Sequence, residues 1–336
     1  MMMKKRIIFA VIAALLLTGC SAGGISSDLS SGTSSSESSA SSESSSSTDN
    51  SSSEYTSGEH DQNGVYVAEG YAARLEYPLS EKDISYAAKR FQFVYEEYLS
   101  KNNCKVYVTV VPDKNYFLAE KHGYPAIDYN KLVELLTGEM DFAEYIDIFP
   151  MLELSDYYRT DTHWRQEKIT DIAGYIAEKM GVKLSANYTE EKVDKPFYGV
   201  HCRQADIEIT PDELVYLKSD FMADCKVIDG ETSKSADIYN LALADSDDPY
   251  EIFLSGAKSL MTIENPNAPT NKELVIFRDS FASSIAPLLA EGYSKITLID
   301  IRYIAPQFLG KFVEFGGQDV LFLYSAPVLN NSITIK

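Results

Sequence analysis

The chain has 336 residues, and its 50 acidic and 30 basic side chains give a formal net charge of −20 at pH 7. Nucleic-acid binding depends on neutralising phosphates with Lys and Arg, so this acidic chain is not expected to bind nucleic acid. When an N-terminal leader and a polar tract are set aside, about 270 residues remain, enough for one large α/β domain.

The first twenty residues have the pattern of an export signal. A basic stretch at 4–6 precedes an apolar stretch at 7–17, which runs into Leu17-Thr18-Gly19-Cys20. The last four resemble a bacterial lipoprotein lipobox, which implies that a signal peptide of residues 1–19 is removed and that the sulfur of Cys20 is lipidated. An uncleaved membrane anchor is the alternative, but an apolar run of about eleven residues is too short to span a bilayer. Both alternatives predict an extracytoplasmic domain, and lipidation anchors it to the membrane.

Residues 20–62 connect the lipobox to the folded domain. Beyond Cys20 the segment is dominated by Ser and contains no Lys or Arg. Such a segment cannot bury enough apolar surface to offset the entropy lost on ordering, so we expect a disordered tether. The folded domain is then expected over 63–336.

The first half of this domain alternates helical and strand-like patterns. Ser80 is placed to cap a helix, and apolar residues recur after it at helical spacing. The clearest amphipathic pattern begins at Ile169 and ends before Gly181. In chain order the sequence predicts a helix over 80–102, a strand over 105–111, a helix over 128–140, an apolar run at 145–149 and a helix over 169–180.

The second half begins with a less regular segment, 188–245, which is interpreted as a β-rich insertion. It holds a strand-like piece at 198–209 and a hairpin at Asp229-Gly230. Alternation then returns, with strands over 273–277, 295–299 and 320–324 and helices over 281–291 and 306–315. This order favours parallel strands with right-handed crossovers. The expected fold class is α/β, a three-layer sandwich with a mainly parallel sheet.

Three polar residues match the parts of an acyl-transfer triad. Asp161 and His163 stand two positions apart, so in an extended or turned backbone the carboxylate can hold the imidazole and leave its second nitrogen free as a base. Ser280 follows a strand and precedes a helix N-terminus, whose positive dipole end favours an oxyanion. The alternatives are a structural histidine paired with its carboxylate, and a serine that only caps its helix.

The cysteines beyond the lipobox are Cys104, Cys202 and Cys225. Cys104 opens an apolar run, which favours a buried thiol. Cys202 and Cys225 can form a disulfide or stay free. No C-x-x-C pair is present, and the Asp161–His163 pair supplies only two ligands, so the sequence predicts neither a metal site nor a cofactor.

Two stretches, Tyr158–Trp164 and Leu274–Tyr303, resemble the bacterial DHHW family and, more distantly, the alginate O-acetylation proteins with an SGNH-hydrolase-like domain. The likeness is strongest at Pro112-Asp113-Lys114, at Asp161-Thr162-His163-Trp164, and at Arg278–Ala282 followed by Ile299–Tyr303. It implies an SGNH-hydrolase-like fold. Transferred by motif, Asp161 is the orienting acid, His163 the general base and Ser280 the acyl-accepting nucleophile.

The resemblance also implies further site residues. Relatives tend to place an Asn after Gly-Gly where this chain has Ser255-Gly256-Ala257, which removes a possible oxyanion donor. Gly199 or the Ser280 backbone is then the expected donor. The remaining candidates for substrate contact are Lys114, Trp164, Arg302 and Tyr303. The alternatives are a core position for Trp164 and an ion pair of Arg302 with Asp279 or Asp300.

The function that this resemblance implies is a membrane-tethered serine acyltransferase or esterase that acts on O-acetyl groups of a cell-envelope or exported polysaccharide. A transferase is expected to receive its acetyl groups through a membrane-embedded acyltransferase partner, whereas an esterase needs none. The alternative is a non-catalytic glycan-binding or assembly lipoprotein on the same fold, because fold does not determine function.

Overall fold

An eight-stranded sheet forms the middle layer of the protein, whose computed structural model describes residues 60–336. From one edge to the other its strands are β4 (Glu144–Tyr145), β3 (Lys105–Val111), β12 (Asp319–Ser325), β10 (Glu273–Arg278), β11 (Lys295–Ile299), β9 (Leu260–Glu264), β7 (Lys226–Asp229) and β8 (Ser235–Ala236). The first five are parallel to one another, and β9, β7 and β8 continue the sheet through antiparallel pairs.

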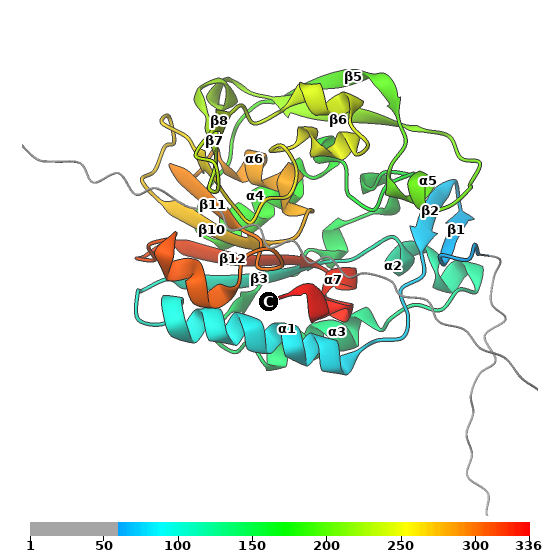
Figure 1. Ribbon diagram of the computed structural model, residues 1–336, viewed down its shortest axis with the longest axis horizontal. Coiled ribbons are helices and arrows are strands. Elements are labelled where there is room, and N and C mark those ends of the chain that lie inside the picture. Colours follow the sequence, from blue (N-terminus) through cyan, green and yellow to red (C-terminus); the bar gives the residue numbers. More distant parts are fainter. Residues whose placement is uncertain (1–59) are drawn as a thin grey trace, which may run out of the picture. The chain divides into compact units, whose positions relative to one another are not determined.

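The strands at the centre of the sheet are apolar on both faces. β12 is buried along its whole length and β10 along all but its first residue, as expected for parallel strands covered on both sides. Helices α4 (Thr170–Lys179) and α6 (Ala282–Leu289) cover one face, and α1 (Glu81–Val94), α3 (Tyr129–Gly138) and α7 (Ala326–Asn330) cover the other (Figure 1). The domain is therefore the predicted three-layer α/β sandwich, although its sheet is mixed.

The connections that follow β10 and β11 run over opposite faces of the sheet, on either side of β10. The chain leaves β10 through α6 and enters β11 on one side, then returns through the 3₁₀ helix Pro306–Lys311 to β12 on the other side of β10. α6 packs in the apolar cluster of one face and Leu309 of the 3₁₀ helix in that of the opposite face. In open α/β sheets, ligands bind beyond the strand ends where the connections diverge in this way.

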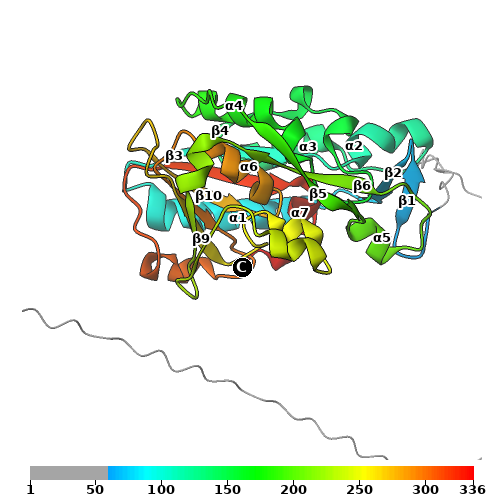
Figure 2. The same ribbon diagram turned by 90° about the horizontal axis from the view of Figure 1, so that it is seen from above.

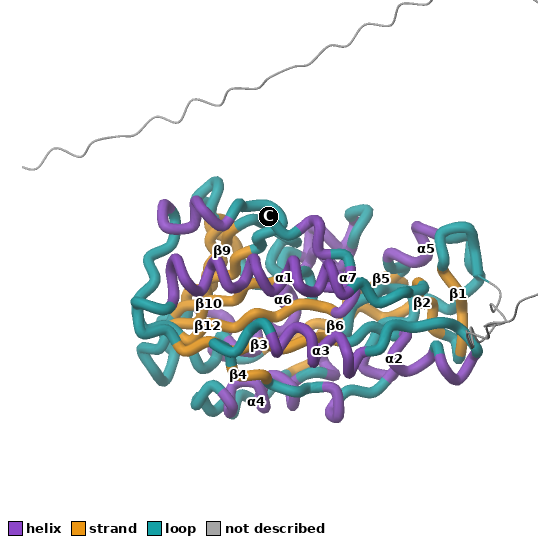
Figure 3. The backbone as a smooth tube through the Cα atoms, turned by 90° about the horizontal axis from the view of Figure 1, so that it is seen from below, coloured by secondary structure: helices purple, strands orange, loops and turns teal. Residues whose placement is uncertain are grey.

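Shorter elements surround the sandwich. They are the hairpin β1 (Val65–Ala68) and β2 (Tyr71–Arg74), the ribbon β5 (Thr189–Phe197) and β6 (Asp212–Lys218), the helices α2 (Asn115–Leu118) and α5 (Val200–Gln204), and a π-helical turn Tyr95–Leu99 after α1. α5 lies beside the β1–β2 hairpin in every view (Figure 1, Figure 2 and Figure 3).

Strongly periodic segments were predicted correctly. Ser80 caps α1 through its hydroxyl, which accepts the N–H of Asp83, and Asp128 caps α3 in the same way through the N–H of Lys131. The strand over 105–111 has the predicted bounds, and the strands and first helix of the last third are β10, α6, β11 and β12. The predicted hairpin is the β7–β8 pair.

The structure differs from the predicted elements in four places. The piece at 198–209 contains the helix α5, and the strands of this region flank it as β5 and β6. The 188–245 segment is only partly an insertion, because β7 pairs with β9 and extends the central sheet. Strand β9 itself was not predicted. The segment expected as a helix over 306–315 forms only the 3₁₀ helix Pro306–Lys311, which begins at a proline.

The three cysteines of the described region are free thiols, so the disulfide between Cys202 and Cys225 is not formed. Cys202 belongs to α5, whereas Cys225 precedes β7 and packs in the core cluster that contains α4 and α6. Cys104 is half-buried. The predicted signal peptide, Cys20 and nearly all of the tether lie outside the described residues. No helix within 60–336 is both long and apolar enough to cross a membrane.

Candidate active site

Ser280 follows the carboxyl end of β10, where the neighbouring carboxylate fixes the backbone. Asp279 Oδ1 accepts the N–H of Phe281 at 3.0 Å, and Asp279 Oδ2 accepts the N–H and the hydroxyl of Ser325, each at 2.7 Å. Because Ser325 ends β12, Asp279 ties this loop to the adjacent parallel strand. Ser280 is thereby held, half-buried, at the carboxyl edge of the sheet.

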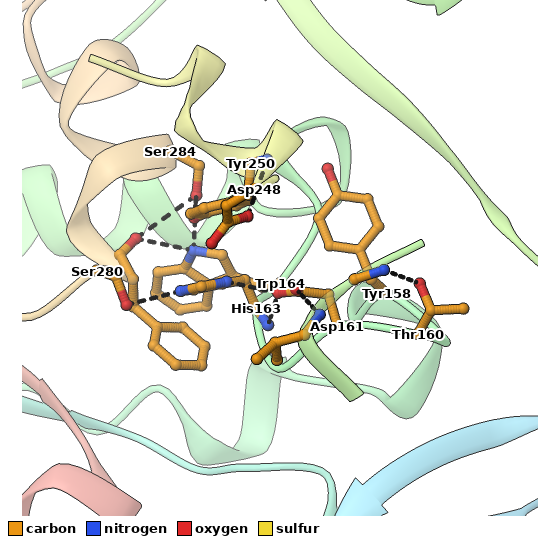
Figure 4. Close-up of polar contacts among 12 residues, drawn as sticks. Tyr158, Thr160, Asp161, His163, Trp164, Asp248, Tyr250, Ser280 and Ser284 are labelled. Carbon is orange, nitrogen blue, oxygen red and sulfur yellow. Dashed lines mark hydrogen bonds and ion pairs between the residues drawn. The ribbon is translucent and has the colours of Figure 1, made fainter. Parts of the chain in front are cut away.

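Asp161, His163 and Ser280 form a continuous chain of hydrogen bonds (Figure 4). His163 Nδ1 lies 2.6 Å from Asp161 Oδ1, and His163 Nε2 lies 2.7 Å from Ser280 Oγ. When Nδ1–H donates to the carboxylate, Nε2 carries the lone pair that accepts the hydroxyl proton of Ser280. His163 and Ser280 are 117 positions apart in the chain, and the fold places them in contact.

The Asp161 carboxylate is buried, with an exposed fraction of 1%. Burial alone would raise its pKa, but the charge and ring N–H of His163 and two backbone N–H groups outweigh it, and the pKa of Asp161 falls well below its usual range. The backbone donors are Val200, 2.8 Å from Oδ2, and His163, 3.0 Å from Oδ1. Asp161 is therefore an anion at neutral pH and stabilises the imidazolium that forms when His163 takes a proton.

Two buried charges hold the loop that carries this acid and base. The ammonium of Lys114 donates to the carbonyls of Tyr158, Arg159 and Asp161 at 2.9, 3.3 and 2.7 Å. The carboxylate of Asp212 accepts the N–H groups of Arg159 and Thr160, both at 2.8 Å, and the Thr160 hydroxyl at 2.6 Å. Because backbone carbonyls occupy the ammonium, Lys114 positions the loop rather than presenting its charge to a substrate, contrary to the sequence-based expectation.

Gly199 allows α5 to approach the acid closely. A Cβ atom at this position would lie 2.2 Å from the Cβ of Asp161, and only glycine fits. Its N–H donates to Thr160 Oγ1 at 2.9 Å, so Gly199 is not placed as the expected oxyanion donor. The other expected donor remains available: the backbone N–H of Ser280 has no acceptor among residues 60–336.

Tyr250 packs flat against the imidazole. The ring centroids of Tyr250 and His163 are 3.8 Å apart and the planes differ by 4°. The Tyr250 hydroxyl donates to Ser284 Oγ on α6 at 2.9 Å. The two ring nitrogens of His163 make its hydrogen bonds at the ring edge, and Tyr250 packs on the ring face. Tyr250 thus fixes the plane of the His163 ring (Figure 4).

Trp164 belongs to the core. It is fully buried, and its indole N–H donates to Ser284 Oγ at 2.9 Å and to the Phe281 carbonyl at 3.1 Å. The expectation that Trp164 contacts substrate was therefore wrong, and the alternative of a core position holds. Its hydrogen bonds join the loop that carries His163 to the start of α6, beside Ser280.

Arg302 and Tyr303 make other interactions than the expected substrate contact. The Arg302 guanidinium pairs with both oxygens of Asp300, at 2.9 and 2.7 Å, which is one of the ion pairs considered as the alternative. Tyr303 is 56% exposed. Within the described residues no hydrogen bond links either side chain to Asp161, His163 or Ser280.

The structure adds residues to the site that the sequence did not indicate. Tyr250 and Asp212 belong to no sequence motif, and the fold places them beside the site from distant parts of the chain. His201, on α5, is 4% exposed, and burial beside the Lys114 cation lowers the pKa of its imidazole to about 3, so the ring is neutral at pH 7. Gly199 and His201 stand two positions apart, but this spacing alone does not indicate a functional site in the sequence.

No family model matches the sequence, and no curated protein matches it. Among solved structures, a DHHW family protein from Eubacterium siraeum is 20% identical with a TM-score of 0.64, over 82% of this chain and 96% of that one. Bacillus cereus PatB1 is 18% identical with a TM-score of 0.61, over 79% of this chain and 96% of that one, and has also been solved with a sulfonyl adduct. The O-acetyltransferase domain of Pseudomonas putida AlgJ is 11% identical with a TM-score of 0.47, over 80% of this chain and 92% of that one. The chain therefore has the fold of the DHHW family protein and of PatB1, which confirms at the level of fold the resemblance to the DHHW family.

Proposed function

We propose that this protein is a serine acyltransferase or esterase that acts on O-acetyl groups of a cell-envelope or exported polysaccharide. The observation that carries the proposal is the hydrogen-bonded chain from Asp161 through His163 to Ser280, beside a backbone N–H that has no acceptor in the described region. The resemblance of two sequence motifs to alginate O-acetylation proteins supports a polysaccharide substrate.

In the first step Ser280 Oγ attacks the carbonyl carbon of an acetyl ester, and His163 Nε2 takes the hydroxyl proton. The negative charge moves to the carbonyl oxygen, where the free N–H of Ser280 stabilises it. The tetrahedral intermediate collapses, the donor alcohol leaves with the proton from His163, and the acetyl group remains on Ser280. The same residues then work in reverse. A sugar hydroxyl or water gives its proton to His163, attacks the acetyl carbon and regenerates the Ser280 hydroxyl.

The sulfonyl adduct of the fold neighbour PatB1 supports testing this chain with a sulfonyl electrophile. The domain from residue 60 is treated with phenylmethylsulfonyl fluoride, and the modified residue is located by peptide mass spectrometry. We expect one adduct on Ser280 and none in Ser280→Ala or His163→Ala. Ser235→Ala, which removes an exposed serine on β8, should label like the wild type. Equal labelling of wild type and Ser280→Ala would contradict the proposed nucleophile.

A non-catalytic glycan-binding protein is the second candidate. The absence of Asn at Ala257 favours it over a fast enzyme, because loss of one oxyanion donor typically raises the barrier by about 2.7–4 kcal/mol. Turnover of p-nitrophenyl acetate that depends on Ser280 distinguishes the two. Glycan binding without any such turnover would establish the second candidate.

Membrane attachment belongs to the same proposal and rests on the lipobox alone. Lipidation at Cys20 would hold the domain outside the cytoplasm, within reach of a membrane-embedded acyltransferase partner if the reaction is transfer. Cys20→Ser in the full chain should move the protein from the membrane fraction to the released fraction.

A further inference from the structure

A cavity of about 210 Å³ lies beside the proposed triad. Thr162, which stands between the acid and the base, forms part of its wall, and so does Val200, whose N–H holds Asp161 Oδ2 at 2.8 Å. Asp113 and His201 also line it, one from the end of β3 and one from α5. The cavity therefore borders the loop that carries Asp161 and His163.

Two of the polar side chains that line this cavity have unused hydrogen-bonding capacity. Asp113 is 6% exposed; its Oδ1 accepts the Tyr129 hydroxyl at 2.8 Å and the Asn115 N–H at 2.7 Å, but its Oδ2 has no partner. His201 is 4% exposed, and its Nδ1 is buried without a partner. Native proteins rarely leave such groups unpaired, so two of them on one cavity point to a ligand that pairs them.

The chemistry of the wall selects the kind of ligand. Asp113 Oδ2 offers an acceptor, and a neutral imidazole can either donate or accept, which suits neighbouring hydroxyl groups. Glu76 places a second carboxylate on the wall, while the ammonium of Lys114 is occupied by three carbonyls. Arg74 also lines the cavity, but its side chain is exposed, whereas the Asp113 and His201 side chains are buried. The buried part of the cavity thus disfavours an anion and suits an uncharged polyol.

We propose that this cavity is the acceptor subsite and binds an uncharged sugar ring of the glycan, with one hydroxyl donating to Asp113 Oδ2 and another bonded to the His201 imidazole. The inference rests on the proposed function, because an acceptor subsite has a meaning only if Ser280 and His163 transfer an acetyl group. The cavity borders the loop that holds His163. In this proposal a hydroxyl of the bound glycan would attack the acetyl group on Ser280 and give its proton to His163 Nε2.

The test measures binding without chemistry. Ser280→Ala protein is titrated with cellotetraose, with N-acetylchitotetraose and with the anionic tetramannuronate, and affinity is followed by ¹⁵N NMR, including the imidazole signals of His201. We expect at least one uncharged oligosaccharide to bind and to shift the His201 signals, with at least tenfold weaker binding of tetramannuronate.

Two variants in the Ser280→Ala background complete the test. Asp113→Asn keeps the oxygen that accepts from Tyr129 and Asn115 but replaces the unpaired acceptor with a donor, and His201→Phe keeps the ring but removes both nitrogens. Each should weaken binding at least tenfold, whereas His122→Phe, which changes an exposed histidine outside the cavity, should not.

Several results would overturn the subsite: equal affinity in all variants, preference for tetramannuronate, or no binding of either uncharged sugar at millimolar concentration. If Asp113→Asn fails to fold, the NMR shifts of His201 and the preference for uncharged over anionic oligosaccharides still show whether the subsite exists. The outcome is independent of the proposed function. Sugar binding without acylation of Ser280 refutes only the catalytic proposal, and acylation without sugar binding refutes only the subsite.

Discussion

At the scale of single residues, the feature that matters most is how firmly His163 is held. A carboxylate oxygen lies 2.6 Å from one ring nitrogen, a serine hydroxyl 2.7 Å from the other, and the Tyr250 ring stacks on its face. These contacts set its tautomer, its direction and its plane before a substrate arrives. Such preorganisation lowers the entropy lost on reaching the transition state.

The first prediction concerns Asp161→Asn. The amide keeps the shape of the carboxylate but no longer fixes the Nδ1–H tautomer or stabilises an imidazolium, so acetylation of Ser280 by p-nitrophenyl acetate should slow on the order of 10³-fold or more. The rate is measured by stopped-flow absorbance, beside the thermal unfolding midpoint. A rate within tenfold of the wild type in a folded variant would mean that Asp161 only holds the loop.

The second prediction concerns Gly199→Ala. The new methyl group would lie 2.2 Å from the Cβ and 2.6 Å from the Cα of Asp161, so backbone must move and stability should fall by about 1–3 kcal/mol. Gly174→Ala is the matched control. This glycine lies within α4, where an added methyl group would have nothing within 4 Å, and alanine should stabilise by about 0.5–1 kcal/mol. Urea unfolding measures both, and equal effects would show that the close approach is not a constraint.

The sequence indicated part of this site for physical reasons that are local. Asp161 and His163 stand at i and i+2, and Ser280 stands between a strand and a helix, so a short window contains each signal. Trp164 and Lys114 were expected at the substrate because they lie in motifs, and their burial became visible only in the fold. Tyr250, Asp212 and His201 contribute through contacts between distant segments, which no local pattern records.

At the scale of elements, the loop over 158–163 is the part on which the site depends. It belongs to no long helix or strand, and its order comes from a cation on its carbonyls and an anion on its N–H groups. Lys114 directly precedes α2, in the turn that follows β3, and Asp212 begins β6. The central sheet and the β5–β6 ribbon therefore hold the loop jointly.

The third prediction concerns Lys114→Met. Removal of the ammonium leaves three buried carbonyls without their donor, and the Asp212 and Asp161 carboxylates lose a nearby cation, so stability should fall by about 3–5 kcal/mol. Acetylation of Ser280 should slow as the loop loosens. Lys82→Met, on the exposed face of α1, is the control and should change stability by less than about 0.5 kcal/mol. A small effect at Lys114 would show that Asp212 alone orders the loop.

Element prediction succeeded where one period dominates a long segment. α1, α3, α4 and α6 carry apolar stripes or caps, and β3, β10, β11 and β12 are continuous apolar runs, which are typical of strands buried on both faces. It failed for α5, which is five residues long and is placed by contacts with the acid rather than by an apolar stripe. β7 and β9 are short, and their place in the central sheet depends on pairing between segments far apart in the chain.

At the scale of the whole molecule, the buried His201 makes stability depend on pH. Its folded-state pKa of about 3 is below the ordinary value of 6.5, because burial disfavours the charged ring. Between these two values the unfolded chain binds a proton that the folded chain does not, so stability rises with pH and is lost as pH falls from 6.5 towards 3.

The fourth prediction follows from this linkage. In His201→Phe the loss of stability between pH 6.5 and pH 4 should be smaller than in the wild type, by on the order of 1.4 kcal/mol for each pH unit. Urea unfolding at several pH values measures it. The lowered pKa of Asp161 also causes a loss of stability in acid. Because Asp161 is present in both proteins, its contribution cancels when the two pH profiles are subtracted. Parallel pH profiles would show that His201 is not buried as a neutral ring.

The role of Ser280 as nucleophile is decided by intact-protein mass spectrometry of the domain from residue 60 after exposure to p-nitrophenyl acetate. A trapped acetyl group adds about 42 Da, and its position is found by peptide mapping. We expect one acetyl group, on Ser280, that is absent from Ser280→Ala and His163→Ala and unchanged in Ser235→Ala. Ser280-dependent turnover without a trapped adduct would have the same meaning. Neither adduct nor turnover in the wild type, or an adduct that persists in Ser280→Ala, would contradict it.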